Sequence, residues 1–138
     1  MAQAKIIWVE NHQFVGIDSS KHSVVLSSQD ENNAVGMKPS DLLLVALASC
    51  TAVDVVQILE KKRTPLSSMR IEVTGDQEKD PPWTFKAIHM DFKVAGMNLR
   101  SDDVKKAIEL SENKYCSVSA SLKGNVNITH SFEILNEH

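Results

Sequence analysis

One segment restricts the possible folds of this 138-residue chain more than any other: the apolar stretch from Pro39 to Lys62. It contains no glycine and no proline after Pro39, which is tolerated in a first helical turn. Ser40 and Asp41 can satisfy the free amides of that turn and suit the positive end of the helix dipole. Thr64-Pro65 then ends the pattern. The stretch therefore predicts one helix of about 24 residues and ~36 Å.

This helix is apolar on every face from Leu42 to Ala48, and such a helix is buried on every side. A globule of this length has a radius of gyration of roughly 14 Å, which is small beside a helix of ~36 Å. We therefore expect more than one subunit's own sheet to cover the helix. The run from Leu42 to Ala48 is far shorter than the ~20 residues of a membrane span, so no membrane partner is expected.

The remaining patterns are strands and short helices. Three short strands precede the long helix, and the tight polar turns between them favour antiparallel hairpins. Two alternating segments follow it, then a helix with Ser101 as its N-cap, a short helix beginning near Cys116, and a last strand. The predicted strands are Lys5–Glu10, Gln13–Asp18, Ser23–Ser28, Ser67–Thr74, Trp83–Val94 and Asn125–Leu135. The order βββ-α-ββ-α(α)-β is an α+β pattern, and the length predicts a single domain over residues 1–138.

Charge and cysteine content exclude several classes of function. Fifteen basic and 18 acidic residues give a net charge of -3, which provides no field to hold DNA or RNA. Two cysteines do not form the disulfide framework of a small secreted protein. The amino terminus lacks a basic segment followed by an apolar one, so no export signal is expected. The expected compartment is the reducing cytoplasm.

The two cysteines are the main candidates for chemistry. Cys116 stands at a predicted helix start, where exposed amides stabilise a thiolate. Cys50 lies in mid-helix and needs a nearby cation or donor to become a nucleophile. Asp54, one turn further on, is interpreted as a solvated charge that would only raise the thiol pKa. The alternative is that both cysteines are small buried hydrophobic side chains.

Other chemistries have little support in the sequence. The five histidines and two cysteines show no close metal-ligand pairing, so no metal site is expected. His89 and His130 are interpreted as half-exposed strand residues. No phosphate-binding loop, dinucleotide motif or serine-hydrolase motif occurs, and no cofactor is expected.

The run from Gly36 through Pro39 to Cys50 resembles the central-helix motif of the OsmC/Ohr superfamily, the osmotically inducible and organic hydroperoxide resistance proteins. The run from Lys114 to Val118 looks like the second cysteine motif of that family. The run from Cys50 to Arg63 is similar to an OsmC-like branch that is usually left uncharacterised. The resemblance covers nearly the whole chain, including the order of the elements.

The resemblance implies a fold and an activity. The fold is an intertwined homodimer in which antiparallel sheets surround a long buried central helix. The activity is a thiol-dependent peroxidase that reduces organic hydroperoxides, with Cys50 as the attacking and Cys116 as the resolving cysteine. An external dithiol would then reset the pair.

The sequence departs from the family where the attacking cysteine is activated. Family peroxidases carry an arginine near the amino-terminal strands, oriented by a glutamate ten residues before the cysteine. Residues 1–39 contain no arginine, and the position of the glutamate holds Ser40, followed by Asp41. Lys21, His22 and Lys38 are the available cations, but a lysine lacks the planar fork of a guanidinium. The alternative hypothesis is therefore an OsmC-like protein that binds a small ligand, or serves in stress, without peroxidase activity.

Overall fold

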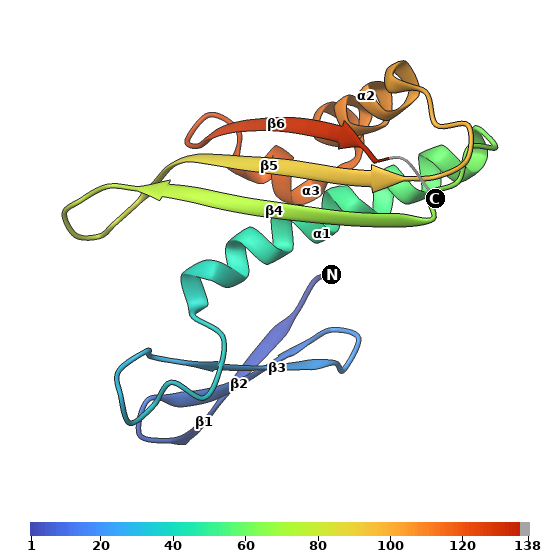
Figure 1. Ribbon diagram of the computed structural model, residues 1–138. Coiled ribbons are helices and arrows are strands. Elements are labelled where there is room, and N and C mark those ends of the chain that lie inside the picture. Colours follow the sequence, from blue (N-terminus) through green and yellow to red (C-terminus); the bar gives the residue numbers. More distant parts are fainter. Residues whose placement is uncertain (136–138) are drawn as a thin grey trace. The chain divides into compact units, whose positions relative to one another are not determined.

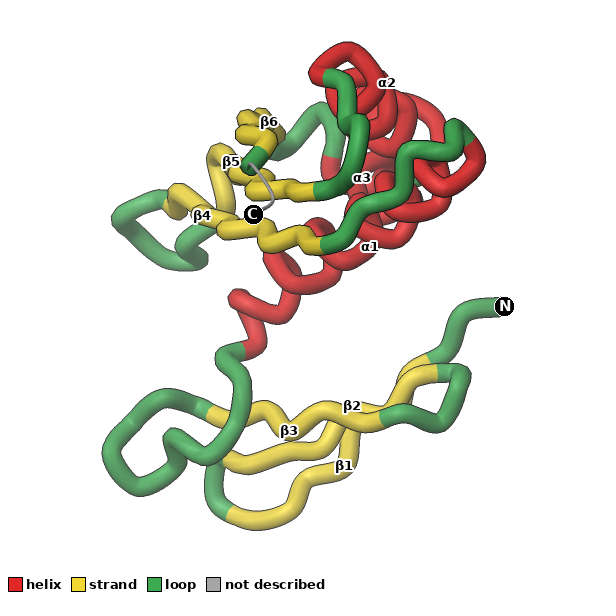
Figure 2. The backbone as a smooth tube through the Cα atoms, turned by 45° about the vertical axis from the view of Figure 1, so that its right-hand side comes forward, coloured by secondary structure: helices red, strands yellow, loops and turns green. Residues whose placement is uncertain are grey.

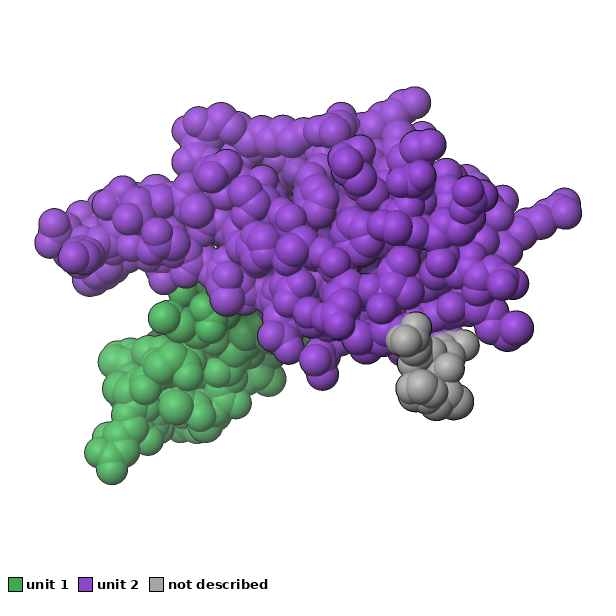
Figure 3. Space-filling view, turned by 45° about the horizontal axis from the view of Figure 1, so that its top comes forward, with its two compact units in different colours: residues 1–43 green, residues 44–138 purple. Residues whose placement is uncertain are grey.

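The chain has the predicted α+β order. The computed structural model describes residues 1–135 and is drawn in Figure 1. Its elements are β1 (Ala4–Glu10), β2 (Gln13–Asp18), β3 (Ser23–Ser27), α1 (Pro39–Lys61), β4 (Ser68–Gln77), β5 (Phe85–Ala95), α2 (Ser101–Leu110), the π-helical turn η1 (Ser111–Tyr115), α3 (Ser117–Leu122) and β6 (Asn127–Ile134). The chain divides into two compact units, residues 1–43 and residues 44–138, which are coloured separately in Figure 3. The single domain over residues 1–138 stays a prediction.

The first unit is a three-stranded antiparallel sheet in the order β1-β2-β3, as the short turns predicted. Strand β1 is exposed along its whole length, and its apolar side chains alternate between both faces of the sheet. Its exposed apolar residues are Ile6, Ile7, Trp8 and Val9. Because so little of this unit is buried, the sheet leaves large apolar side chains uncovered within one chain.

The second unit contains a mixed sheet in the order β4-β5-β6. Strands β4 and β5 pair antiparallel, but β5 and β6 pair parallel, with Phe92 opposite Phe132. The expectation of antiparallel sheets is therefore wrong at this pair. The physical reason is the connection: α2, η1 and α3 lie between the two strands and return the chain to the starting end of the sheet, which a tight hairpin cannot do.

One face of the second sheet is covered by helices, as the edge-on view of Figure 2 shows. Alternate residues of β5 on that face are fully buried, which accounts for the apolar alternation of this strand. They are Ile88, Met90, Phe92 and Val94. They form one core with Leu47, Val55 and Leu59 of α1 and with Val104 and Ile108 of α2.

Helix α1 begins at Pro39 as predicted and ends at Lys61, one residue before the predicted end. Within one chain it is buried on one side only, because Val53 is 55% exposed whereas Val55 is fully buried. The expectation of burial on every side is therefore not met by one chain alone. By length and composition this helix is also apolar enough to cross a membrane, a test that core helices of soluble proteins pass as well. Its buried side packs into the protein core described above.

Several element boundaries differ from the sequence predictions by one to three residues. Strand β4 continues through Gly75 to Gln77, so the charged turn before β5 is shorter than expected. Arg100 rather than Ser101 occupies the N-cap position of α2, with extended backbone and no side-chain capping bond. Ser101 is instead the first helical residue, since the chain enters the helix one residue earlier than the composition indicated.

Candidate functional site: a pair of thiols

Cys50 lies on α1, half-buried against the core of the second unit. The next residue, Thr51, is fully buried, and its hydroxyl donates to the carbonyl oxygen of Leu47 at 3.2 Å. The same hydroxyl lies 3.9 Å from the sulfur of Cys116. The turn of α1 that carries Cys50 therefore also contacts the second cysteine.

Cys116 stands between η1 and α3 and is only 2% exposed. Its sulfur caps α3 by accepting the backbone N–H of Ser119 at 3.3 Å. Its own backbone N–H donates to the carbonyl oxygen of Ser111 at 2.8 Å, which closes the π-helical turn. Cys116 is therefore held by backbone bonds on both sides.

The electrostatics of Cys116 correct the expectation of an easily deprotonated thiol. Burial raises the pKa of Cys116, and the hydrogen bond to the Cys50 thiol raises it further. The N–H of Ser119 and the hydroxyl of Thr51 act in the opposite direction but do not compensate. The expectation considered only the helix start, whereas α3 is a six-residue helix and desolvation of the thiolate dominates.

Both cysteines are free, and the Cys50 thiol lies near enough to Cys116 to raise the pKa of Cys116. Their distance in sequence does not indicate this contact, which arises because the segment from η1 to α3 packs beside α1. The alternative reading of both residues as simple buried hydrophobes fits Cys116 better than Cys50, which keeps part of its surface exposed. Their catalytic roles stay predictions.

The five proposed activating or orienting residues all belong to the first unit. Ser40 and Asp41 lie in the first turn of α1, directly after Lys38. Lys21 and His22 lie in the turn between β2 and β3, where the Asp18 carboxylate accepts the backbone N–H of His22 at 2.9 Å. Since each unit is described on its own, a role for any of the five at Cys50 stays a prediction.

One polar contact beside the thiols was not predicted from the sequence. The hydroxyl of Ser111, which is fully buried, donates to the carboxylate of Asp54 at 2.7 Å. Asp54 follows Cys50 by one helical turn and was expected to be merely solvated, which is wrong. The available signal was the serine itself, a small polar residue at a position of the apolar stripe of α2.

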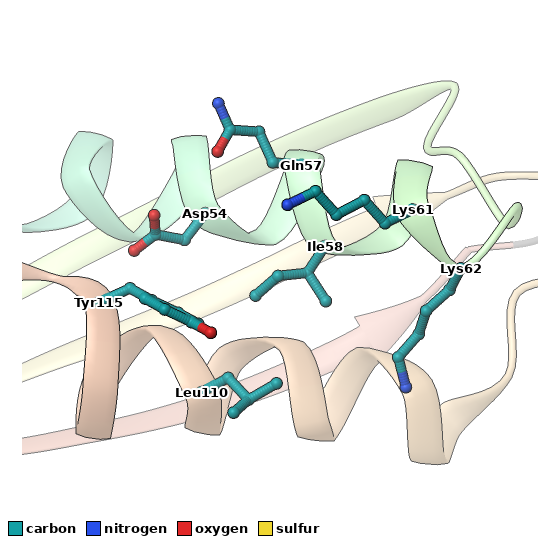
Figure 4. A pocket seen from close by; sticks show the side chains of 7 residues that line it. All are labelled: Asp54, Gln57, Ile58, Lys61, Lys62, Leu110 and Tyr115. Carbon is teal, nitrogen blue, oxygen red and sulfur yellow. The ribbon is translucent and has the colours of Figure 1, made fainter.

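A cleft lies on the second unit between α1 and the segment from α2 to η1 (Figure 4), and one of its walls is Tyr115, which precedes Cys116 in the sequence. Its volume is about 340 Å³. Its walls combine apolar groups with charges at both ends; they are Asp54, Gln57, Ile58, Lys61, Lys62, Leu110 and Tyr115. The ammonium of Lys62 pairs with Asp103 at 3.2 Å. Such walls suit a small amphipathic molecule.

Among the described residues 1–135, no group of three or more histidine, cysteine or acidic side chains is placed to hold a metal ion. His130 contacts the Glu112 carboxylate at 3.0 Å, and His89 contacts Thr129 at 2.7 Å on the outer face of the sheet. Both are partly exposed strand residues, as expected.

Sequence comparison now identifies the class of protein. The family model described as OsmC-like protein matches residues 29–131, so the chain belongs to the OsmC-like family. Protein YhfA of Escherichia coli strain K12 is 35% identical over 133 residues, which cover 96% of this chain and 98% of YhfA. The resemblance drawn from the two cysteine motifs is thereby confirmed.

Solved structures agree in fold. A hypothetical protein from Aquifex aeolicus VF5 is 27% identical, with a TM-score of 0.88 over 100% of this chain and 98% of that chain. The organic hydroperoxide resistance protein OhrB of Bacillus subtilis is 16% identical, with a TM-score of 0.63 over 96% and 98%. The predicted OsmC-like α+β fold is therefore confirmed.

Proposed function

We propose that the protein is a thiol-dependent peroxidase that reduces organic hydroperoxides through Cys50 and Cys116. The observation that carries the proposal is a pair of free, neighbouring thiols in which burial and the Cys50 thiol raise the pKa of Cys116. A relative by fold, OhrB, is named as an organic hydroperoxide resistance protein. Membership of the same family makes this chemistry the first to test.

The proposed cycle starts with the Cys50 thiolate, which attacks the distal oxygen of the hydroperoxide. The O–O bond breaks, the alcohol leaves with a proton, and Cys50 becomes a sulfenic acid. The sulfur of Cys116 then attacks that sulfur, forming the disulfide and releasing water. An external dithiol restores both thiols by exchange and is itself oxidised to a disulfide. The sum is one hydroperoxide and one dithiol converted to alcohol, water and disulfide.

The thiol contact supports this order of roles. Because burial and the neighbouring thiol raise the pKa of Cys116, Cys116 is poorly suited to be the attacking thiolate. The S–H of Cys116 then serves as a donor toward the sulfur of Cys50. Cys50 is also the more exposed of the two, so a substrate reaches it first.

The test is peroxide consumption by the purified, reduced protein. With cumene hydroperoxide and dithiothreitol, we expect turnover by the wild type and none above background by Cys50→Ser. Cys116→Ser should still consume one equivalent of hydroperoxide and stop at a sulfenic acid, which dimedone traps for mass spectrometry. Ser49→Ala is the matched control, since Ser49 is an exposed neighbour on the same helix. Wild-type turnover no faster than that of Cys50→Ser would sink the proposal.

A second function is a ligand-binding role without peroxidase activity, favoured by the missing arginine and by the amphipathic cleft beside Asp54. Native mass spectrometry of protein isolated from cells tests it. A ligand retained in stoichiometric amount, together with no peroxide turnover, supports this function. A cleft that stays empty against a broad screen of lipophilic and thiol-reactive compounds contradicts it.

We further propose a cytoplasmic homodimer that binds neither nucleic acid nor membrane. The exposed apolar side chains of β1 and Val53 of α1 are the surfaces that a second copy would cover. The net charge of -3 offers no attraction to polyanions. The mass of the protein in solution, measured at several concentrations, tests the dimer.

A further inference from the structure

We propose that the hydrogen bond between Ser111 and Asp54 is a clamp that positions Cys116 beside Cys50. Ser111 and Asp54 are positioning residues in this view, and the inference rests on the proposed redox role of the two cysteines. Nothing in the expected chemistry of the family site requires either residue. The clamp acts through the π-helical turn that leads into Cys116.

The contacts form one continuous path between the two cysteines. Asp54 lies on α1 one turn after Cys50, and its carboxylate accepts the hydroxyl of Ser111 at 2.7 Å. Ser111 opens η1, and its carbonyl oxygen accepts the backbone N–H of Cys116 at 2.8 Å. One serine therefore ties the helix of the first cysteine to the backbone of the second. Because Ser111 is fully buried, its hydrogen bond to the Asp54 carboxylate is stronger than the same bond would be in water.

The π-helical turn explains why a clamp is needed. A π turn is rare, and it persists where side chains hold its backbone groups. Here the carbonyl oxygen of Glu112 accepts from the Lys123 ammonium at 2.6 Å and from the Ser119 hydroxyl at 3.4 Å. The Glu112 carboxylate contacts His130 of β6 at 3.0 Å. These bonds tie the turn to α3 and β6, and among the hydrogen bonds of residues 1–135 only the one from Ser111 to Asp54 ties it to α1.

The clamp predicts a change in the equilibrium between the two thiols and their disulfide. Without it, the turn is free to shift away from α1, and the effective concentration of one sulfur at the other falls. A hydrogen bond to a carboxylate is worth enough to expect a fall of about tenfold in that concentration. The measurement is the equilibrium of the protein with glutathione, in which one oxidised glutathione and the protein dithiol give the protein disulfide and two reduced glutathiones.

The variants are Ser111→Ala, Asp54→Ala and Asp54→Asn. The first two should lower the effective concentration about tenfold, whereas Asp54→Asn, whose amide oxygen still accepts from Ser111, should recover most of it. Asp103→Ala is the matched control, because it breaks the ion pair at 3.2 Å between α2 and Lys62, the residue that directly follows α1. Circular dichroism and urea unfolding establish that each variant is folded before the redox titration.

The outcomes separate this inference from the proposed peroxidase. An unchanged effective concentration in folded Ser111→Ala overturns the clamp, and so does an equal fall in Asp103→Ala, since that would be general loosening. A clamp-dependent disulfide in a protein that consumes no hydroperoxide supports the clamp and contradicts the peroxidase. A wild type that consumes hydroperoxide but forms no disulfide at any glutathione ratio supports the peroxidase activity, contradicts the resolving role of Cys116 and overturns the clamp.

Discussion

The substitution Val53→Ala tests whether a second copy of the chain covers the free side of α1. Val53 is 55% exposed, whereas Val55 on the same helix is fully buried, so the two valines form a matched pair. Val53→Ala removes two carbon atoms that the single chain only half covers. In a monomer the free energy of unfolding should change by no more than about 0.5 kcal/mol.

In the proposed homodimer the same change has a calculable effect on association. Burial of a methylene group contributes about 0.8 kcal/mol, and 55% of Val53 is available for new burial, so the two lost carbons forfeit about 0.9 kcal/mol per copy. A twofold interface uses each residue twice, which gives about 1.8 kcal/mol. That energy corresponds to a roughly 20-fold higher dissociation constant.

Sedimentation velocity over a wide range of protein concentration measures this constant directly. If dissociation and unfolding are coupled, the concentration dependence of the urea midpoint replaces it. Val55→Ala is the comparison: it should lower the free energy of unfolding by about 2 kcal/mol through the core, without a comparable effect on association. A wild type that stays monomeric, or a change below threefold for Val53→Ala, refutes the covered helix.

Three further predictions concern pH and backbone packing. Because the pKa of Cys116 is raised in the folded state, its contribution to stability is fully present below the ordinary thiol pKa of about 8.5 and is lost as the pH rises through the raised pKa. The free energy of unfolding of the reduced wild type, measured with urea, should therefore fall more steeply above about pH 9 than that of Cys116→Ala. Hydrogen bonds from Ser28 and Asn33 lower the pKa of Asp30 to about 2, so the NMR signal of its carboxyl carbon should titrate near pH 2, and a midpoint near pH 4 contradicts the structure. Any stability that these bonds contribute is present above about pH 4 and is lost as the pH falls toward 2. Gly36→Ala should lower the free energy of unfolding by about 1–3 kcal/mol, because the new Cβ would lie 2.7 Å from the backbone of Val25. Gly16→Ala is the control for thermal unfolding, since a Cβ there meets only side chains at 3.3 Å or more, and equal effects of the two substitutions contradict the prediction.

Local signals account for the parts of the fold that the sequence predicted well. Helix α1 starts at Pro39 and ends before Thr64-Pro65 because proline and capping chemistry act within a turn of the boundary. The parallel pairing of β5 with β6 was not predicted, since it depends on how α2, η1 and α3 cross the sheet. No local sequence pattern in β5 or β6 indicates whether its neighbour runs parallel or antiparallel to it. Pairing direction is a property of the tertiary path.

For the candidate site, too, the sequence predicted the residues involved but not the contacts between them. The residue type and the two motifs pointed to Cys50 and Cys116, but their contact is a long-range one that spacing does not encode. The environment of Asp54 was misjudged for that reason. On a helix drawn alone it is a solvated carboxylate, and only the packing of η1 beside α1 brings the hydroxyl of Ser111 to it.

The thiol of Cys116 shows how burial can reverse a local argument. A cysteine before a helix start accepts a backbone N–H, and by itself that bond favours the thiolate. The same residue is almost completely enclosed by the core, where a charge loses its hydration, and the neighbouring Cys50 thiol raises the pKa of Cys116 further. Desolvation is the largest influence, so the proton stays on Cys116. A protonated, enclosed sulfur is poorly suited to attack a substrate first but well suited to meet an oxidised neighbour, which is the division of roles that the redox experiments on Cys50 and Ser111 can test.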